Sequence, residues 1–338
     1  MTSAQATARP GGRRMKIGLM LPIWTDGSGL PRWTSDPGAA SIRWTNLATL
    51  AQLAEEIGLD SLWVPDHFLM DDRWDAPSEE AAAEDAMTDE PPSGAWDCWS
   101  ILAALATSTS RVELGTLVSC TAYRNPALLA RIADTVDEIS GGRVILGVGA
   151  GDQWREHQAF GFAWGRPIGR FEEALQIIVP LLRDGGVDFV GEHYSARDCE
   201  LLPRGPRSKG PPILIGALGT RPRMPRLVTQ YADMWNGWFA FDDDPRAGAS
   251  AAMLRVDVAC IEHGRDPATL ERTVGISVAL PGASAEDSSL SGTPEEIAAG
   301  LSYCAGLGVH HLQVVLAPPT PAGVTAFGKV LRHLDEMA

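Results

Sequence analysis

The stretch GLDSLWVPDHF, residues Gly58–Phe68, contains a helix stop, a short apolar run and two ionisable side chains in succession. Glycine is a common terminator of a helix, and the apolar residues of Trp44–Ile57 recur at helical spacing just before it. The run Ser61–Val64 predicts a buried strand. That strand meets Asp66 and His67, which form either an ordinary strand end in contact with water or part of an active site.

The same order of helix, glycine and strand recurs along the chain. The sequence around Gly308 repeats the Gly-apolar-x-x-Leu-x-Val spacing that begins at Gly58. Apolar runs without clean alternation predict eight strands, at Lys16–Leu21, Ser61–Val64, Val112–Val118, Val144–Val148, Ile213–Ile215, Met234–Trp238, Val274–Leu280 and His311–Leu316. Such runs are typical of parallel strands that are covered on both faces, and a helical pattern follows each of them. Eight strand–helix units predict a (β/α)8 TIM barrel, in the α/β class.

The barrel is expected to occupy residues 15–338 as a single domain, after a disordered tail at residues 1–14. Three long insertions interrupt the alternation of strands and helices. They cover approximately residues 68–96, 152–169 and 187–211. We expect the first two to be loops and the third to contain a hairpin around Gly191. Barrel active sites are built from loops at the C-terminal face, so these insertions are expected there.

Composition and sequence patterns argue against several classes of function. The formal net charge of −15 disfavours nucleic-acid binding. The five cysteines contain no C-x-x-C pair, which argues against a zinc site and a disulfide framework and fits a reducing cytoplasm. Adjacent His310 and His311 would face opposite sides of a strand, so no metal site is predicted. No apolar run approaches the length of a membrane span, and no signal peptide is recognisable.

Two glycine-rich strand ends are candidate binding elements. In Gly147–Gly151 the next residue is Asp152 and no helix is expected to follow at once, so we reject a Rossmann fingerprint. The run Gly216–Thr220 precedes a helix that contains Arg221, Arg223 and Arg226. A helix N-terminus with arginines suits a phosphate, although a tight strand–helix turn would have the same sequence.

An ordered set of motifs resembles the bacterial luciferase-like superfamily, and within it the actinobacterial branch that uses the deazaflavin coenzyme F420. The motifs are GLDSLWVPDH, RVELGT at Arg111–Thr116, YRNP at Tyr123–Pro126, SGGR at Ser140–Arg143, GVGAG at Gly147–Gly151, Glu156 with Phe160-Gly161, RFEEA at Arg170–Ala174, PILIG at Pro212–Gly216, and YAD with Asn236. The sister branch uses reduced FMN and oxygen.

The resemblance implies roles for individual residues. Asp66 and His67 would lie against the cofactor ring, with His67 as a candidate catalytic residue for proton transfer. Asp152 matches a family acid–base glutamate that is one methylene longer, and Arg155 replaces an amide. A non-proline cis peptide is expected at Leu117–Val118. The remaining implied cofactor contacts are Leu117, Val118, Ala150, Gly151, Asp152 and Arg155 at the ring, and Gly216, Ala217, Leu218 and Gly219 at the phosphate.

The leading hypothesis is therefore an F420-dependent oxidoreductase that transfers a hydride to or from a small apolar or aromatic substrate. Tryptophans near the predicted mouth suggest that substrate class, and Trp238 disfavours a sugar phosphate. The alternative is an FMN-dependent monooxygenase that needs a partner flavin reductase. A barrel that binds a ligand without catalysis and a metal-dependent hydrolase are remoter alternatives. The resemblance also implies a homodimer, and a separate F420 or flavin reductase is a possible partner.

Overall fold

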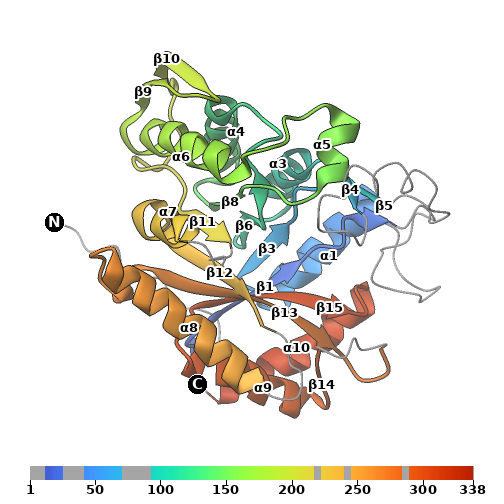
Figure 1. Ribbon diagram of the computed structural model, residues 1–338. Helices are drawn as coiled ribbons and strands as arrows, with labels where there is room; N and C mark the ends of the chain where they lie inside the picture. The colour runs from blue at the N-terminus through green and yellow to red at the C-terminus, as the bar shows by residue number, and fades with distance from the viewer. Residues whose placement is uncertain are drawn as a thin grey trace, which may run out of the picture.

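The computed structural model describes residues 12–25, 42–70, 93–216, 222–239, 245–283 and 289–337. Eight parallel strands form a closed ring within these ranges (Figure 1). In ring order they are β1 (Lys16–Met20), β3 (Ser61–Val64), β6 (Glu113–Thr116), β8 (Val144–Gly149), β11 (Ile213–Gly216), β12 (Met234–Trp238), β13 (Glu271–Ala279) and β15 (His311–Ala317), which pairs with β1 again. The predicted parallel barrel is confirmed.

Helices surround the ring. They are α1 (Trp44–Glu56), α3 (Cys98–Ser108), α4 (Pro126–Ser140), α5 (Trp154–Phe160), α6 (Pro167–Asp184), α7 (Arg223–Tyr231), α8 (Pro245–Glu262), α9 (Pro294–Gly306) and α10 (Pro321–Glu336), with a short 3-10 turn, η3 (Pro267–Thr269). The glycine stops act as predicted, because Gly58 and Gly308 adopt φ values of 92° and 87°, which L-residues with a side chain rarely adopt. Thr293 and Glu296 form a capping box at the start of α9.

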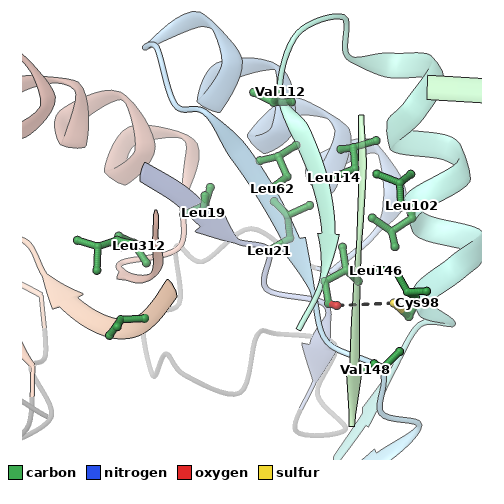
Figure 2. Close-up of a cluster of buried hydrophobic side chains, with 14 of the residues drawn as sticks. Leu19, Leu21, Leu62, Cys98, Leu102, Val112, Leu114, Leu146, Val148 and Leu312 are labelled. Atoms are coloured by element: carbon green, nitrogen blue, oxygen red, sulfur yellow. Dashed lines mark hydrogen bonds between the residues drawn. The ribbon is translucent and has the colours of Figure 1, made fainter. Parts of the chain in front are cut away.

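Alternate residues of the strands face opposite sides of the barrel wall. Leu62, Leu114 and Leu146 face outward and pack with Leu102 of α3 (Figure 2). The thiol of Cys98 in α3 donates a hydrogen bond to the carbonyl of Val64 at 3.6 Å. This apolar layer between strands and helices forms the main hydrophobic core.

Trp63 is fully buried and is the largest side chain of the apolar cluster inside the barrel. Glycines on the two neighbouring strands make room for it, because a Cβ atom on Gly18 or Gly115 would lie 2.5 or 2.2 Å from its ring. Its indole Nε1 donates to Ser61 Oγ at 2.7 Å, and Ser61 Oγ lies 2.6 Å from Nε2 of His311. The lower part of the barrel is thus a packed, hydrogen-bonded plug, and ligands are left with the mouth at the C-terminal strand ends.

The insertions differ in part from the expectation. The third does contain a hairpin, formed by β9 (Gly186–Val190) and β10 (Ser195–Glu200), but it follows α6 and packs along that helix. The prediction of a loop at 152–169 is wrong, since α5 begins at Trp154. A helix of this length offers too few turns for a periodic apolar pattern, so its start was invisible in the sequence.

Short strands complete the structure. An antiparallel sheet of β2 (Trp24–Thr25), β5 (Ser93–Ala95) and β4 (Leu69–Met70) lies beside the barrel, with β4 next to α5 (Figure 1). β7 (Ser119–Cys120) and β14 (Leu290–Ser291) extend the barrel sheet beside β8 and β13. Most of the insertion at 68–96 and of the expected tail at 1–14 lies outside the described residues. Arg13 in that tail is buried and pairs with Asp335 at 3.2 Å, so the expectation of disorder is wrong there.

Candidate functional site

His67 lies at the C-terminal mouth, three residues beyond the end of β3. Its Nδ1 is 2.9 Å from Oε2 of Glu156 on α5. β3 and the β8–α5 connection are not neighbours in the ring, because β6 lies between them. The contact therefore joins the segment after β3 to helix α5, across the end of β6. The side chain of His67 retains an exposed fraction of 18%, so the imidazole is still accessible from the mouth.

The Glu156 carboxylate is completely buried and accepts four hydrogen bonds. Oε1 accepts from the backbone N–H groups of Phe68 and Leu69, the latter at 2.9 Å. Oε2 accepts from the Tyr123 hydroxyl and is paired with His67. A buried carboxylate is stable only when donors of this kind replace its water shell.

The protonation equilibria of the two partners shift in opposite directions. Burial lowers the pKa of His67, but the hydrogen bond and charge of Glu156, with the carboxylates of Asp152 and Asp66, raise it above its ordinary value of 6.5. Burial raises the pKa of Glu156, but His67, the Tyr123 hydroxyl and the Leu69 N–H outweigh it and hold the pKa below 4.5. Both shifts favour the imidazolium–carboxylate form of the pair over its neutral form.

Aromatic rings enclose the Glu156 carboxylate. Phe68 lies 5.4 Å from Tyr123 and 4.8 Å from Phe160 between ring centroids, and Phe162 stacks on Tyr123 at 4.8 Å. These rings exclude water from the carboxylate, which strengthens its interaction with His67.

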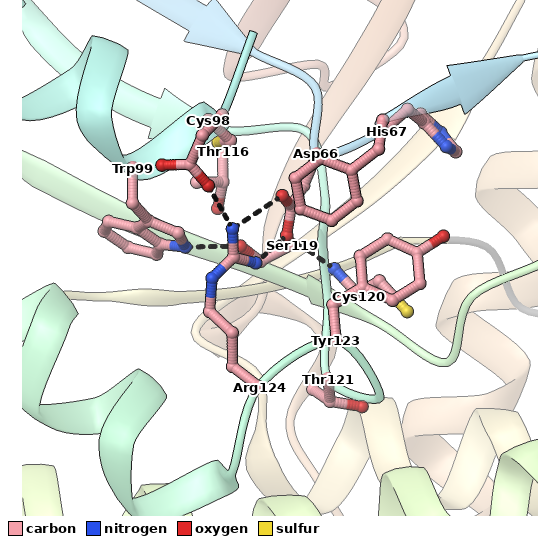
Figure 3. Close-up of polar contacts among 12 residues, drawn as sticks. Asp66, His67, Cys98, Trp99, Thr116, Ser119, Cys120, Thr121, Tyr123 and Arg124 are labelled. Carbon is pink, nitrogen blue, oxygen red and sulfur yellow. Dashed lines mark hydrogen bonds and ion pairs between the residues drawn. The ribbon is translucent and has the colours of Figure 1, made fainter. Parts of the chain in front are cut away.

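Asp66 occupies a different environment from His67 (Figure 3). It is buried, and its oxygens accept hydrogen bonds from Nη1 and Nη2 of Arg124 at 2.6 and 3.1 Å. The backbone N–H of Cys120 donates to the same carboxylate at 3.2 Å, and Arg124 also binds Asp97 at 2.7 Å. Asp66 thus ties the end of β3 to the segment after β6, and its predicted contact with a cofactor remains a prediction.

The segment after β6 contains the expected backbone feature, since the Leu117–Val118 peptide bond is cis. Val118 faces the glycines of the neighbouring strand: a Cβ on Gly149 would lie 2.8 Å from its Cγ2. A Cβ on Gly151 would lie 2.5 Å from Sγ of Cys120. Gly149 at the end of β8 and Gly151 just after it therefore allow close packing of the β6 and β8 ends.

The residues between β8 and α5 differ in their surroundings. Asp152 is exposed and lies close enough to His67 for its charge to raise the pKa of that imidazole. Arg155 is half-buried. Gln153 is fully buried, and neither its amide nitrogen nor its amide oxygen has a hydrogen-bond partner among the described residues. Buried polar groups are normally paired, so Gln153 is a candidate to bind a ligand. Ring contacts of Ala150 and Gly151 remain predictions.

Only part of the predicted phosphate site can be placed. Gly216 ends β11, whereas Ala217, Leu218 and Gly219 lie outside the described residues. Arg223 and Arg226 both pair with Glu172 of α6, whose carboxylate compensates much of their charge. These two arginines are therefore less available to an anion than the sequence suggested, and the phosphate site remains a prediction.

Tryptophans flank the mouth at two points. Trp24 meets the His67 ring edge-on, with centroids 5.7 Å apart. Trp238 at the end of β12 is 56% exposed and lies against Gly275. A small apolar cavity of about 20 Å³ adjoins Trp24, between the ends of β1, β3 and β15. A larger cavity of about 260 Å³ lies at the opposite face, between Arg13–Met15, α9 and α10, far from His67. The candidate site is therefore placed by the ionisable side chains at the mouth, and not by the larger cavity.

The described part of the chain shows neither a metal site nor a membrane-spanning helix. No group of three histidine, cysteine, aspartate or glutamate side chains could hold a metal ion there. His311 faces the barrel interior and His310 accepts a hydrogen bond from the Arg272 N–H, so the adjacent histidines do not converge. Within the same ranges, every helix is too short or too polar to span a bilayer.

Sequence reasoning assigned no role to Glu156, Tyr123, Arg124 or Gln153. Glu156, Tyr123 and Arg124 do occur in the motifs quoted above, and this was the only sequence feature that could have indicated a role for them. The residues that they contact are known only from the folded chain.

Comparison with known proteins places this geometry in a family. The luciferase-like monooxygenase family model matches residues 28–287. The chain is 31% identical over 192 residues to a 5,10-methylenetetrahydromethanopterin reductase of Archaeoglobus fulgidus, covering 57% of this chain and 48% of the relative. It is 34% identical over 191 residues to an F420-dependent glucose-6-phosphate dehydrogenase of Amycolatopsis mediterranei, covering 55% and 50%. The match thus spans about half the length of these curated relatives.

Solved structures share the fold. An F420-dependent secondary alcohol dehydrogenase in complex with an F420-acetone adduct superposes with a TM-score of 0.71 at 18% identity, over 95% of this chain and 99% of that chain. The chain therefore belongs to the luciferase-like monooxygenase family, and the expectation of a luciferase-like enzyme is confirmed at the level of the family.

Proposed function

We propose that this member of the luciferase-like family is an F420-dependent oxidoreductase that transfers a hydride between the deazaflavin and a small apolar or aromatic substrate. The observation that carries the proposal is the accessible His67 imidazole at the barrel mouth, held from behind by the buried Glu156 carboxylate. The two relatives named above support this choice over the flavin alternative. One is a reductase, and the other is an F420-dependent dehydrogenase.

The residues at the mouth fit a flat, polar-edged cofactor. The Gln153 amide is left unpaired among the described residues beside the end of β8, and it offers one donor group and one acceptor. Flavins and deazaflavins share a ring edge on which N–H and C=O groups alternate, which such an amide complements. Once bound, the deazaflavin would supply the hydride chemistry, and the protein would supply binding and orientation.

The roles of the chain's own groups follow from their placement. Nε2 of His67 would give a proton to, or take one from, the substrate, and exposed Asp152 is the second candidate for that step. Leu117, Val118, Ala150, Gly151 and Arg155 would line the ring, and Gly216–Gly219 would hold the phosphate. Asp66 would position the loop after β6. Trp24 and Trp238 would contribute apolar walls for the substrate.

The second candidate is an FMN-dependent monooxygenase, and the description of the matched family favours it. Anaerobic titration with F420 and with FMN, each oxidised and reduced, separates the two through quenching of the eleven tryptophans. We expect tight F420 binding. Tight FMN binding without any response to F420 would reject the F420 proposal, and a partner flavin reductase would then be required.

Loss of turnover in His67→Ala, with cofactor binding retained, would separate an enzyme from a barrel that only binds a ligand. The measurement requires an F420-linked assay on a panel of apolar alcohols, ketones and aromatic acceptors. If the variant turned over as fast as the wild type, His67 would have no part in the chemistry.

We also propose that the protein forms a homodimer through α8 and acts in the cytoplasm. Leu254, Val258 and Ile261 on the outer face of α8 are 64, 44 and 68% exposed, while the inward face of the same helix is also apolar. In an antiparallel pair centred on Val258, exposed Arg255 of one copy would approach exposed Glu262 of the other. All five cysteines are free, which supports a reducing compartment.

A further inference from the structure

The two oxygens of Glu156 have separate tasks. Oε1 accepts only backbone N–H groups, from Phe68 and Leu69, and so secures the loop after β3. Oε2 is turned to two side chains, the Tyr123 hydroxyl and Nδ1 of His67. Since a carboxylate accepts and never donates when ionised, the hydrogen atom in the 2.9 Å contact belongs to Nδ1 of the imidazole.

We propose that Glu156 is a positioning residue for His67: it fixes the ring with Nδ1–H directed at α5 and leaves Nε2 as the atom that exchanges a proton at the barrel mouth. This deepens, and rests on, the proposed role of His67 in proton transfer. Glu156 itself is completely buried behind His67, so it acts only through the imidazole.

The surroundings of His67 support an electrostatic as well as a steric role. The charged groups that act on the imidazole are Glu156 on α5, which contacts it, and Asp152 and Asp66, which act through their charge. Trp24 on β2 adds only an aromatic edge. All three carboxylates favour the charged form of the ring, and Glu156 contributes the largest effect among them. Removal of this single charge should therefore make His67 easier to deprotonate.

Glu156→Gln is a sharp test because it changes one oxygen into a donor and keeps the shape. The amide oxygen can still accept the Phe68 and Leu69 N–H groups, but the amide nitrogen then faces Nδ1 and requires it to be an acceptor. The neutral ring is therefore expected to switch from the Nδ1–H form to the Nε2–H form. Loss of the opposite charge should also lower the pKa of His67 by about one unit or more.

The measurement is ¹⁵N NMR of histidine-labelled protein without cofactor, across a pH titration. His67→Asn identifies the signal among the seven histidines. Tyr123→Phe is the matched control: it removes the other donor to Oε2 but leaves the carboxylate, so the Nδ1–H form should persist. An unchanged tautomer and unchanged pKa in Glu156→Gln would overturn the proposal.

If Glu156→Gln does not fold, Glu156→Asp replaces it. Its carboxylate keeps the charge but is withdrawn by one methylene, so the Nδ1–H form should persist with a smaller fall in the pKa of His67; an unchanged pKa would overturn the proposal. Because these readouts need neither F420 nor substrate, they succeed or fail independently of the cofactor titration. A switched tautomer together with no F420 binding would retain the positioning role and reject the proposed cofactor.

Discussion

Arg124→Met should be among the most destabilising substitutions near the mouth. The Asp66 carboxylate has no exposed surface, the Arg124 side chain is only 11% exposed, and two charged hydrogen bonds of 2.6 and 3.1 Å join them. Removing the arginine leaves a buried charge with the Cys120 N–H as its remaining backbone donor. Breaking such a buried pair lowers the free energy of unfolding by about 3–5 kcal/mol.

The partner on the other side of Arg124 contributes little to this loss. Asp97 is 40% exposed, so water can replace the guanidinium there. The matched control is Arg166→Met, which breaks a pair whose side chains are 66 and 59% exposed and should cost about 0–1 kcal/mol. Urea unfolding followed by tryptophan fluorescence at neutral pH compares the two.

Two further results are expected if the buried charge is the cause. The double variant Asp66→Asn with Arg124→Met should be more stable than Arg124→Met alone, because it removes the uncompensated charge. Burial raises the pKa of Asp66 in the folded protein. A carboxyl whose folded pKa exceeds its unfolded pKa destabilises the fold as the pH rises above the unfolded value, and this effect is absent at lower pH. The deficit of Arg124→Met should therefore shrink as the pH falls. A deficit equal to that of Arg166→Met, or a double variant no more stable than the single one, would refute the reasoning.

Three other predictions concern separate parts of the molecule. Gly115→Ala places a methyl group 2.2 Å from the buried Trp63 indole and should lower the free energy of unfolding by about 1–3 kcal/mol. Gly306→Ala is the control, because its methyl group would have no neighbour within 4 Å and should leave the stability unchanged. Urea denaturation of both variants tests this. Val258→Asp on α8 should convert a dimer into a monomer in light scattering, and an unchanged mass would reject the α8 interface. The His67–Glu156 pair should stabilise the fold fully between the unfolded glutamate pKa of 4.5 and the unfolded histidine pKa of 6.5. This contribution is lost at higher pH, as the pH rises through the raised pKa of His67. It is also lost at lower pH, as the pH falls through the lowered pKa of Glu156. Wild type and His67→Asn should therefore differ most near about pH 5.5, and progressively less as the pH rises above the histidine pKa, measured by urea denaturation; a constant difference would contradict the linkage.

The barrel was predictable from the sequence because its signals are local. Apolar runs of strand length, helical spacing and glycine stops such as Gly58 act over a few residues, and the eightfold repetition of this order leaves few alternative folds. The position of His67 at the mouth followed from the same logic, since a residue just after a barrel strand must lie at the C-terminal face. The short helix α5 was missed because it is too brief to show a period.

The partners of the site residues depend on contacts between distant parts of the chain. Glu156 lies 89 residues from His67, and Arg124 lies 58 residues from Asp66. No local pattern encodes which carboxylate meets which cation. Closure of the ring brings the ends of β3, β6 and β8 together, and burial then requires each charge to find a donor or a counter-ion.

The sequence by itself thus determined the barrel and placed His67 at its C-terminal end, where the active site is predicted. Only the tertiary structure decided that neighbouring Asp66 and His67 differ in environment. Asp66 is turned inward to Arg124 and is buried, while His67 is held by Glu156 and stays accessible. The physical reason is that successive side chains beyond a strand end project in different directions, and only the assembled loops determine what each one meets.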